Sequence, residues 1–190
     1  MLEQVCKLQR RRLNEKNRVV PISVNQSRLL LYNPGYVDTL IDLVDRYEIP
    51  HHLIELEITE TVVFEDKIVA IKTFKQLLDR GFKISMDDFG SGYSSLNMLK
   101  DIDVSIIKID RAFLENFMNT ERGKKVMFSI LGLIRDLNLI SVAEGVETKE
   151  QLDFLKEAGC HWVQGYYFSK PVPVLDFLKK LDIETLNNIF

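Results

Sequence analysis

The chain has 190 residues, of which 46% are hydrophobic and 28% charged, a balance typical of one globular domain and not of a disordered segment. Its formal net charge of -3 offers no general attraction for a polyanion, which argues against an extended nucleic-acid surface. The longest apolar stretch, residues 126–134, is far shorter than the roughly 20 residues that a membrane-spanning helix needs. The two cysteines, Cys6 and Cys160, form no zinc or redox motif, so we expect a cytoplasmic protein without a membrane segment.

Short β-branched runs alternate with longer segments of helical period, a pattern typical of repeated βα units around a parallel sheet. An amphipathic helix begins the chain. Six strands are expected after it, at residues 19–24, 53–58, 83–86, 105–109, 139–143 and 161–164. Several of these runs are apolar along their length, as strands covered on both faces should be.

Residues that begin or end helices lie between the expected strands. Asn33 followed by Pro34 predicts a helix start, and Thr148 with Gln151 predicts a capping box. Gly81 stands where a left-handed residue would end a helix. The helix before Gly81 is expected to bury one face, made of Ile68, Ile71, Phe74, Leu77 and Leu78.

The strand pattern suits either a doubly wound sheet or a TIM barrel, both in the α/β class. A doubly wound nucleotide-binding sheet would usually carry a glycine-rich turn after its first strand, and none follows residue 24. A (β/α)8 barrel is therefore favoured, but a complete one has eight strands and about 250 residues. We expect one domain built as an incomplete barrel of about six strands.

Nearly every expected strand delivers a polar or charged side chain at its carboxyl end, which is the catalytic face of a barrel. One such acid is usually a helix cap or a solvated residue, but agreement among six strands favours a site. Converging carboxylates repel one another unless they are protonated or bind cations, and oxygen ligands select Mg²⁺, Mn²⁺ or Ca²⁺. The side chains are Asn25, Glu57, Glu60, Asp87, Asp88, Lys108, Asp110, Glu144, Glu147 and Gln164.

The adjacent acids Asp87 and Asp88 are suited to hold two metal ions, which would polarise a phosphodiester and stabilise an attacking hydroxide. Lys108 would contact the phosphate or hold the water. The Asp88-Phe-Gly90 triplet also occurs in protein kinases, but no glycine-rich loop or His-Arg-Asp segment accompanies it. We expect residues 88–95 to form a mobile loop over the mouth, the alternative being a plain turn between strand and helix.

Two other groups of side chains are expected to be structural. His51 and His52 follow a proline before a strand, which predicts a turn that faces solvent, and His161 is expected to be structural. Four aromatic residues lie near Gln164, and core packing is favoured over a platform for stacking bases. They are Trp162, Tyr166, Tyr167 and Phe168.

Six motifs follow one another along the chain: Ser23-Val-Asn25, Glu57-Ile-Thr-Glu60, Asp87-Asp-Phe-Gly90, Lys108-Ile-Asp110, Glu144-Gly-Val-Glu147 and Gln164-Gly165. This set resembles the ordered motifs of EAL-domain phosphodiesterases. The resemblance covers residues 1–181 and leaves residues 182–190 as a tail. It implies a modified TIM barrel and metal-dependent hydrolysis of cyclic di-GMP to linear pGpG, with Mg²⁺ or Mn²⁺ at a two-metal site and inhibition by Ca²⁺.

The resemblance also implies a role for each motif residue. The expected metal ligands are Asn25, Glu57, Asp87 and Asp88. The expected catalytic residues are Lys108, which positions water or phosphate, Glu144, which is a general base or a ligand of metal-bound water, and Asp88. Support for the substrate or for the loop is expected from Glu60, Asp110, Glu147 and Gln164.

The sequence departs from the family because it contains no Glu-Ala-Leu-x-Arg segment, whose glutamate is a metal ligand in the family. We therefore expect weakened metal binding and impaired activity of the isolated chain. Two missing strands would leave open edges at Val24 and Val163, which predicts a homodimer or a strand-completing partner. A non-catalytic module that binds cyclic di-GMP or a protein is the main alternative, and a remnant without a ligand is the last.

Overall fold

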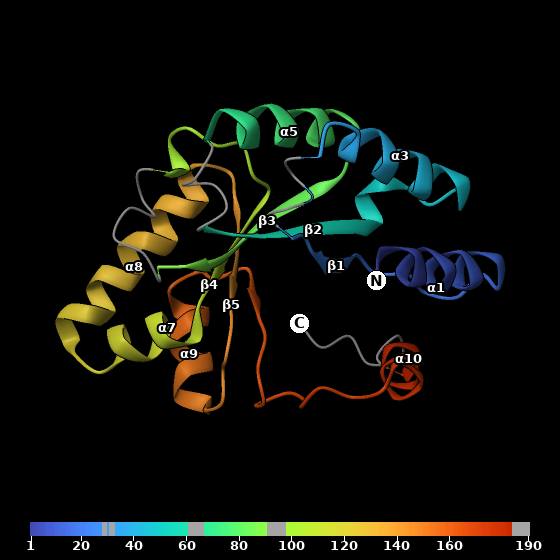
Figure 1. Ribbon diagram of the computed structural model, residues 1–190. Helices are drawn as coiled ribbons and strands as arrows, with labels where there is room; N and C mark the ends of the chain where they lie inside the picture. Colours follow the sequence, from blue (N-terminus) through green and yellow to red (C-terminus); the bar gives the residue numbers. More distant parts are fainter. Residues whose placement is uncertain (28–29, 31–32, 61–66, 91–97, 184–190) are drawn as a thin grey trace.

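Six parallel strands form one curled sheet, a half-barrel whose strand order follows the sequence (Figure 1). The computed structural model describes residues 1–27, 30, 33–60, 67–90 and 98–183. Neighbouring strands are parallel throughout, which confirms the α/β class and the barrel-like curvature that the sequence predicts. The strands are β1 (Ile22–Asn25), β2 (Ile54–Thr59), β3 (Lys83–Phe89), β4 (Ile106–Ile109), β5 (Ile140–Ala143) and β6 (Trp162–Val163).

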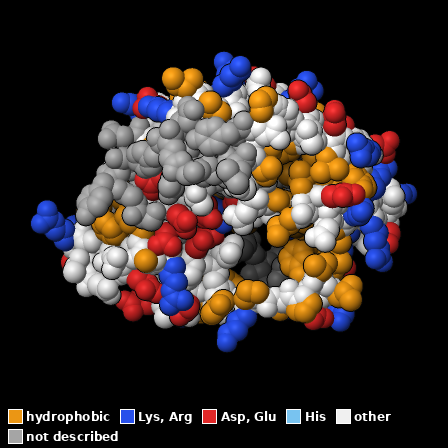
Figure 2. All heavy atoms as spheres, in the orientation of Figure 1, with side chains coloured by type: hydrophobic (Ala, Val, Ile, Leu, Met, Phe, Trp, Pro, Cys, Tyr) orange, Lys and Arg blue, Asp and Glu red, His pale blue; other side chains and the backbone are white. Residues whose placement is uncertain are grey.

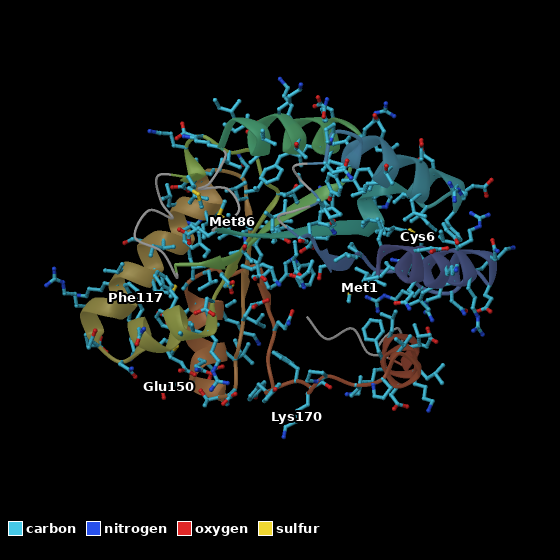
Figure 3. The ribbon with its side chains drawn as sticks, in the orientation of Figure 1. Met1, Cys6, Met86, Phe117, Glu150 and Lys170 are labelled. Atoms are coloured by element: carbon cyan, nitrogen blue, oxygen red, sulfur yellow. The ribbon has the colours of Figure 1, made fainter. Side chains whose placement is uncertain are left out.

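Helices connect the strands and lie around the outside of the curled sheet (Figure 1). Cys6 is fully buried where α1 packs against α3 (Figure 3). None of the helices within the described ranges is long and apolar enough to cross a membrane. The helices are α1 (Leu2–Asn14), α3 (Tyr36–Arg46), α5 (Lys67–Asp79), α7 (Arg111–Met118), α8 (Glu121–Asp136), α9 (Lys149–Glu157) and α10 (Val174–Ile183), with a 3-10 turn η1 (His51–Leu53).

The core lies between the sheet and these helices. Alternate side chains of a strand point to opposite faces, so Leu56, Ile84 and Ile107 enter the core while their sequence neighbours face the other side. Each such side chain contributes about 1.5–3 kcal/mol by leaving water. The core therefore fixes the strands, and the opposite, concave face is left for polar side chains.

Two expected helix features are wrong. The helix α3 begins at Tyr36 with Gly35 as its N-cap, because the Asn33 carbonyl oxygen accepts the Gly35 and Tyr36 amides in a turn before the helix. In α5, Ile68 is 82% exposed although it was expected to be buried with Leu77. The two residues are nine positions apart, about two and a half helical turns, and so lie on opposite sides of the helix.

Other helix ends match their sequence signals. Thr148 Oγ1 accepts the Gln151 amide at 3.2 Å, and Gln151 Oε1 accepts the Thr148 amide at 3.0 Å, which completes the predicted capping box of α9. Gly81 has a φ of 91° after α5, the left-handed conformation expected there.

His51 is not the solvent-facing turn residue that the sequence suggested. Its Nε2 atom lies 2.7 Å from Asp45 Oδ1 and its Nδ1 atom 2.6 Å from the Arg80 carbonyl oxygen. The ring also stacks on Phe82, with the ring centroids 4.3 Å apart. These contacts tie the end of α3 to the start of β3. His161, by contrast, contacts the Ser141 hydroxyl at 2.9 Å and is structural, as expected.

The two edges of the sheet flank an apolar cavity of about 810 Å³. Within the described part of the chain, β1 pairs only with β2 and β6 only with β5. Figure 2 shows hydrophobic side chains around this hollow. The four aromatic residues expected in the core are exposed instead, Trp162 by 59%; this residue lies on β6, which among the described residues has a neighbouring strand on one side only. The others are Tyr166, Tyr167 and Phe168.

The helix α10 continues through Ile183, past the end of the expected domain at Leu181. It contacts α1 through Arg12, whose buried guanidinium lies 2.5 Å from Asp182 Oδ1. This ion pair connects the end of α10 to α1.

Candidate functional site

The concave face of the sheet is polar because β2 and β3 alternate between apolar and polar residues. Glu55 and Glu57 of β2 share this face, as do Ser85 and Asp87 of β3. Glu57 is opposite Ser85 in the register, and Thr59 is opposite Asp87. Polar side chains of neighbouring strands therefore lie side by side on the concave face, in rows that follow one another toward the carboxyl end of the sheet.

Three carboxylates converge at that end. Oxygen atoms of Glu57, Asp87 and Glu144 all lie within 4.8 Å of one another, although the residues come from β2, β3 and the segment after β5. The Glu144 amide donates to the Ile109 carbonyl oxygen at 3.0 Å, which holds Glu144 beside the end of β4. Acidic side chains gather near the centre of the face drawn in Figure 2. We call Glu57, Asp87 and Glu144 the acidic triad.

Lys108, on β4, places its ammonium among the triad. Its Nζ atom hydrogen-bonds Glu57 Oε1, lies 2.6 Å from Glu144 Oε1 and is 3.5 Å from Asp87 Oδ1. Burial alone would lower the pKa of Lys108, but the hydrogen bonds of Glu144 and Glu57 raise it above its usual value. The lysine therefore stays protonated at neutral pH.

The carboxyl of Glu144 has a raised pKa. Burial is the main cause, and the negative charges of Asp87 and Glu57 add to it, while Lys108 acts in the opposite direction. A carboxyl group with a raised pKa accepts a proton more readily near neutral pH than an ordinary glutamate.

The acidic triad fits a hard divalent ion. Its donors are carboxylate oxygens, which Mg²⁺ and Mn²⁺ prefer. The Asp87 Oδ1 atom is buried and accepts no hydrogen bond from any residue that the structure describes. A buried acceptor without a hydrogen-bond donor is costly, and the Lys108 ammonium, 3.5 Å away, serves this atom only through its charge. The atom is therefore suited to a metal ion.

Asp88 follows the triad residue Asp87 but has a different environment. Its φ of 57° is left-handed, and the β3–β4 register shifts between Met86 and Phe89. Such a bulge turns successive side chains in different directions. Asp88 is exposed and outside the triad, and its pKa is raised by partial burial and by the charges of Asp87 and Asp110.

Asn25 and Gln164 lie on the two edge strands or directly after them. Asn25 ends β1, and its register partner is Glu57, so it borders the triad from the open side of the sheet. Gln164 follows β6 and borders the cavity. Both side chains are exposed.

The remaining expected support residues have local partners. Asp110 caps α7, since its Oδ1 atom accepts the Ala112 amide at 2.8 Å. Glu147 pairs with Arg111 at 2.6 Å. Glu60 is buried directly after β2. The expected mobile loop falls largely on residues 91–97, which lie outside the described residues; Gly90, before them, has a φ of 99° and no room for a side chain beside Phe113.

Sequence reasoning missed Glu55 and Ser85, which also lie on the concave face. Ser85 is fully buried, and burial raises the pKa of Glu55. The spacing of two between Glu55 and Glu57, and between Ser85 and Asp87, was the signal that could have found them.

Comparison with known proteins assigns the family. Residues 1–171 match the model of the EAL domain. The chain belongs to the EAL domain family. This membership confirms the resemblance that the six motifs indicate.

Individual relatives agree with this family. The EAL chain is 31% identical over 177 residues to the signaling protein YkoW of Bacillus subtilis, covering 93% of this chain and 22% of YkoW. It is 37% identical over 179 residues to MucR of Pseudomonas aeruginosa, a bifunctional diguanylate cyclase/cyclic di-GMP phosphodiesterase, covering 94% of this chain and 26% of MucR. The chain thus spans about a quarter or less of these relatives.

A solved structure supports the same fold. The PaMucR phosphodiesterase in complex with c-di-GMP superposes on this EAL chain with a TM-score of 0.84 and 35% sequence identity. The match covers 93% of this chain and 71% of the other. The half-barrel is therefore the arrangement that EAL domains share over these residues.

Proposed function

We propose that this EAL domain hydrolyses cyclic di-GMP to linear pGpG with the help of Mg²⁺ or Mn²⁺. The observation that carries the proposal is the convergence of Glu57, Asp87 and Glu144 around Lys108 at the carboxyl end of the sheet. The names of relatives support the choice of substrate, since MucR is a cyclic di-GMP phosphodiesterase.

In the reaction that we propose, water attacks a phosphorus atom, the bond from that phosphorus to a ribose 3′ oxygen breaks, and the ring opens. The oxygen of the water stays on phosphorus, and the 3′ oxygen leaves as a hydroxyl after it takes a proton from solvent. A bound divalent ion would polarise the phosphodiester and lower the pKa of the attacking water. Glu57 and Asp87 would hold the ion. Glu144 would accept the proton of the water at a carboxylate oxygen, a role that its raised pKa favours. Lys108 would orient the water or a phosphate oxygen.

The other motif residues are assigned supporting roles in this proposal. Asn25 would complete the ligands of the first ion from β1, and Asp88 would help to hold a second ion beside Asp87. Glu60 would anchor the loop that follows β3. Asp110 and Glu147 support the segments after β4 and β5 through their contacts with α7 and Arg111, and Gln164 would border the substrate.

The proposal is tested by incubating the chain with cyclic di-GMP and Mg²⁺ or Mn²⁺ and separating the products by chromatography. We expect pGpG to form, its formation to stop with a chelator, and the Glu144→Ala variant to lose at least about 100-fold in rate. A sizing column on the same preparation shows that the variant is folded. Folded wild-type protein that forms no pGpG would contradict the proposal for this chain.

A second candidate is a module that binds cyclic di-GMP without hydrolysing it. Its support is the exposure of two amide side chains, Asn25 on the edge strand β1 and Gln164 directly after the edge strand β6. Binding of the dinucleotide without turnover and without a requirement for Mg²⁺ would favour this candidate. We also propose that a second copy or another polypeptide covers the edges at β1 and β6.

A further inference from the structure

Lys108 reaches the acidic triad from β4 with little access to water. Its side chain is 9% exposed, and its ammonium contacts all three carboxylates that could hold a metal ion. Three negative charges and one positive charge leave two negative charges in the group. The lysine therefore neutralises only part of the triad.

This contact has a structural use. Glu57 is almost fully buried, and a buried carboxylate without a counter-ion strongly disfavours folding. The Lys108 ammonium satisfies Glu57 and Glu144 directly and lies near Asp87. It therefore holds the carboxylates of β2, of β3 and of the segment after β5 close together.

The same contact opposes a second cation. Mg²⁺ requires ligand oxygens at about 2.0–2.1 Å. An ammonium that contacts the same three carboxylates would lie close to this ion, and two cations repel each other strongly in a poorly hydrated site. Simultaneous full contact of both cations with the triad is thus disfavoured.

We propose that Lys108 is the resident cation of the acidic triad and that a divalent ion binds there by displacing the Lys108 ammonium from its carboxylates. This inference rests on the proposed function, because it requires the triad to hold a metal ion. Metal binding is then an exchange of cations, and its affinity is lower than that of the three carboxylates alone. The displaced ammonium becomes free to contact a phosphate oxygen, so metal loading prepares Lys108 for the substrate.

The first arm of the test compares Mn²⁺ affinity in the absence of substrate, measured by electron paramagnetic resonance. Lys108→Met should bind Mn²⁺ about tenfold more tightly or better, because the competing charge is gone. Lys83→Met is the matched control, because Lys83 lies at the start of β3, at the opposite end of that strand from Asp87. Its Mn²⁺ affinity should equal that of the wild type. Equal or weaker binding by Lys108→Met would overturn the inference.

The second arm uses the wild-type chain and therefore does not depend on a variant that folds. The rate at which Lys108 is modified by an amine reagent is measured by peptide mass spectrometry, with and without saturating Mg²⁺. Displacement predicts that modification of Lys108 becomes severalfold faster with Mg²⁺, while modification of Lys83 does not change.

The outcomes separate this inference from the function on which it rests. Bound metal with unchanged or slower modification of Lys108 would overturn the exchange and leave the metal site intact. A wild-type chain that binds no Mn²⁺ or Mg²⁺ would overturn the metal-dependent function and the exchange together.

Discussion

At the scale of single residues, Glu55 shows that a buried acid on the polar concave face lowers the stability of the fold. Burial raises the pKa of its carboxyl above the ordinary value of 4.5, with Glu57 adding to the effect. A folded-state pKa above the unfolded one means that the ionised group disfavours folding at neutral pH, and that this penalty shrinks as the pH falls through the raised pKa and is gone below 4.5.

We therefore predict that Glu55→Gln raises the free energy of unfolding at pH 7 by up to about 1 kcal/mol. The gain should shrink as the pH is lowered from 7 to below 4.5, because the wild-type carboxyl then becomes neutral in both states. Urea unfolding across this pH range measures the difference. A gain that is independent of pH, or a loss at pH 7, would contradict the prediction.

Some site residues could be found in the sequence and others could not. Glu57 and Asp87 lie near the carboxyl ends of the neighbouring strands β2 and β3, so their proximity follows from strand order. Glu144 follows β5, which β4 separates from β3, and strand order places it at the same end of the sheet without bringing it into contact. The contacts of the Lys108 ammonium depend on side-chain conformation, which no strand pattern specifies. The left-handed conformation of Asp88 could not be predicted either, because the bulge that accompanies it is not marked by any particular residue type in the sequence.

At the scale of elements, the turn after β6 depends on close contact between two backbones. A Cβ atom at Gly165 would lie 2.1 Å from the Val146 carbonyl oxygen, which itself accepts the Tyr167 amide. The Val146 amide in turn donates to the Gln164 carbonyl oxygen at 3.1 Å. This turn therefore joins the segments that carry Gln164 and Glu147.

Gly165→Ala should lower the free energy of unfolding by about 1–3 kcal/mol, because the backbone must move to admit the methyl group. Gly132→Ala is the control: it lies within α8, where a Cβ atom meets only Arg135 Nη2 at 3.9 Å. The control should gain up to about 1 kcal/mol from helix propensity. Thermal or urea unfolding compares the two, and equal stabilities would refute the close contact.

The positions of the elements were largely predictable, while their ends and exposed faces were less so. Each expected strand overlaps an observed one, because β-branched apolar runs mark buried parallel strands. The capping box at Thr148 could also be predicted from the sequence, since it needs only two residues at a fixed spacing. The prediction that Ile68 is buried was wrong because it rested on the apolar character of this residue, whereas its position in the first turn of α5 places it on the side of the helix opposite the core.

At the scale of the whole molecule, the open sheet brings apolar side chains to its surface. Trp162 was expected in the core because aromatic residues usually pack there, and its exposure follows from the edge position of β6, a tertiary feature that local sequence does not reveal. Unpaired strand edges beside apolar residues promote association with other chains.

We predict that this chain self-associates as its concentration rises. Trp162→Lys should reduce the association, because it places a charge beside the edge of β6. Ile68→Lys, which removes a similarly exposed apolar residue from α5, should leave it unchanged. Sedimentation over a range of concentrations measures the effect, and a monomer at every concentration would refute the prediction.

The central claim is that the acidic triad binds a divalent metal ion, and calorimetric titration with Mn²⁺ tests it most directly. Asp87→Asn removes a charge from the triad and should weaken binding at least about tenfold. Asp110→Asn alters a nearby acid that caps α7, and asparagine can keep that cap, so its Mn²⁺ affinity should match the wild type. Equal Mn²⁺ affinity in the wild type and in Asp87→Asn would contradict the account.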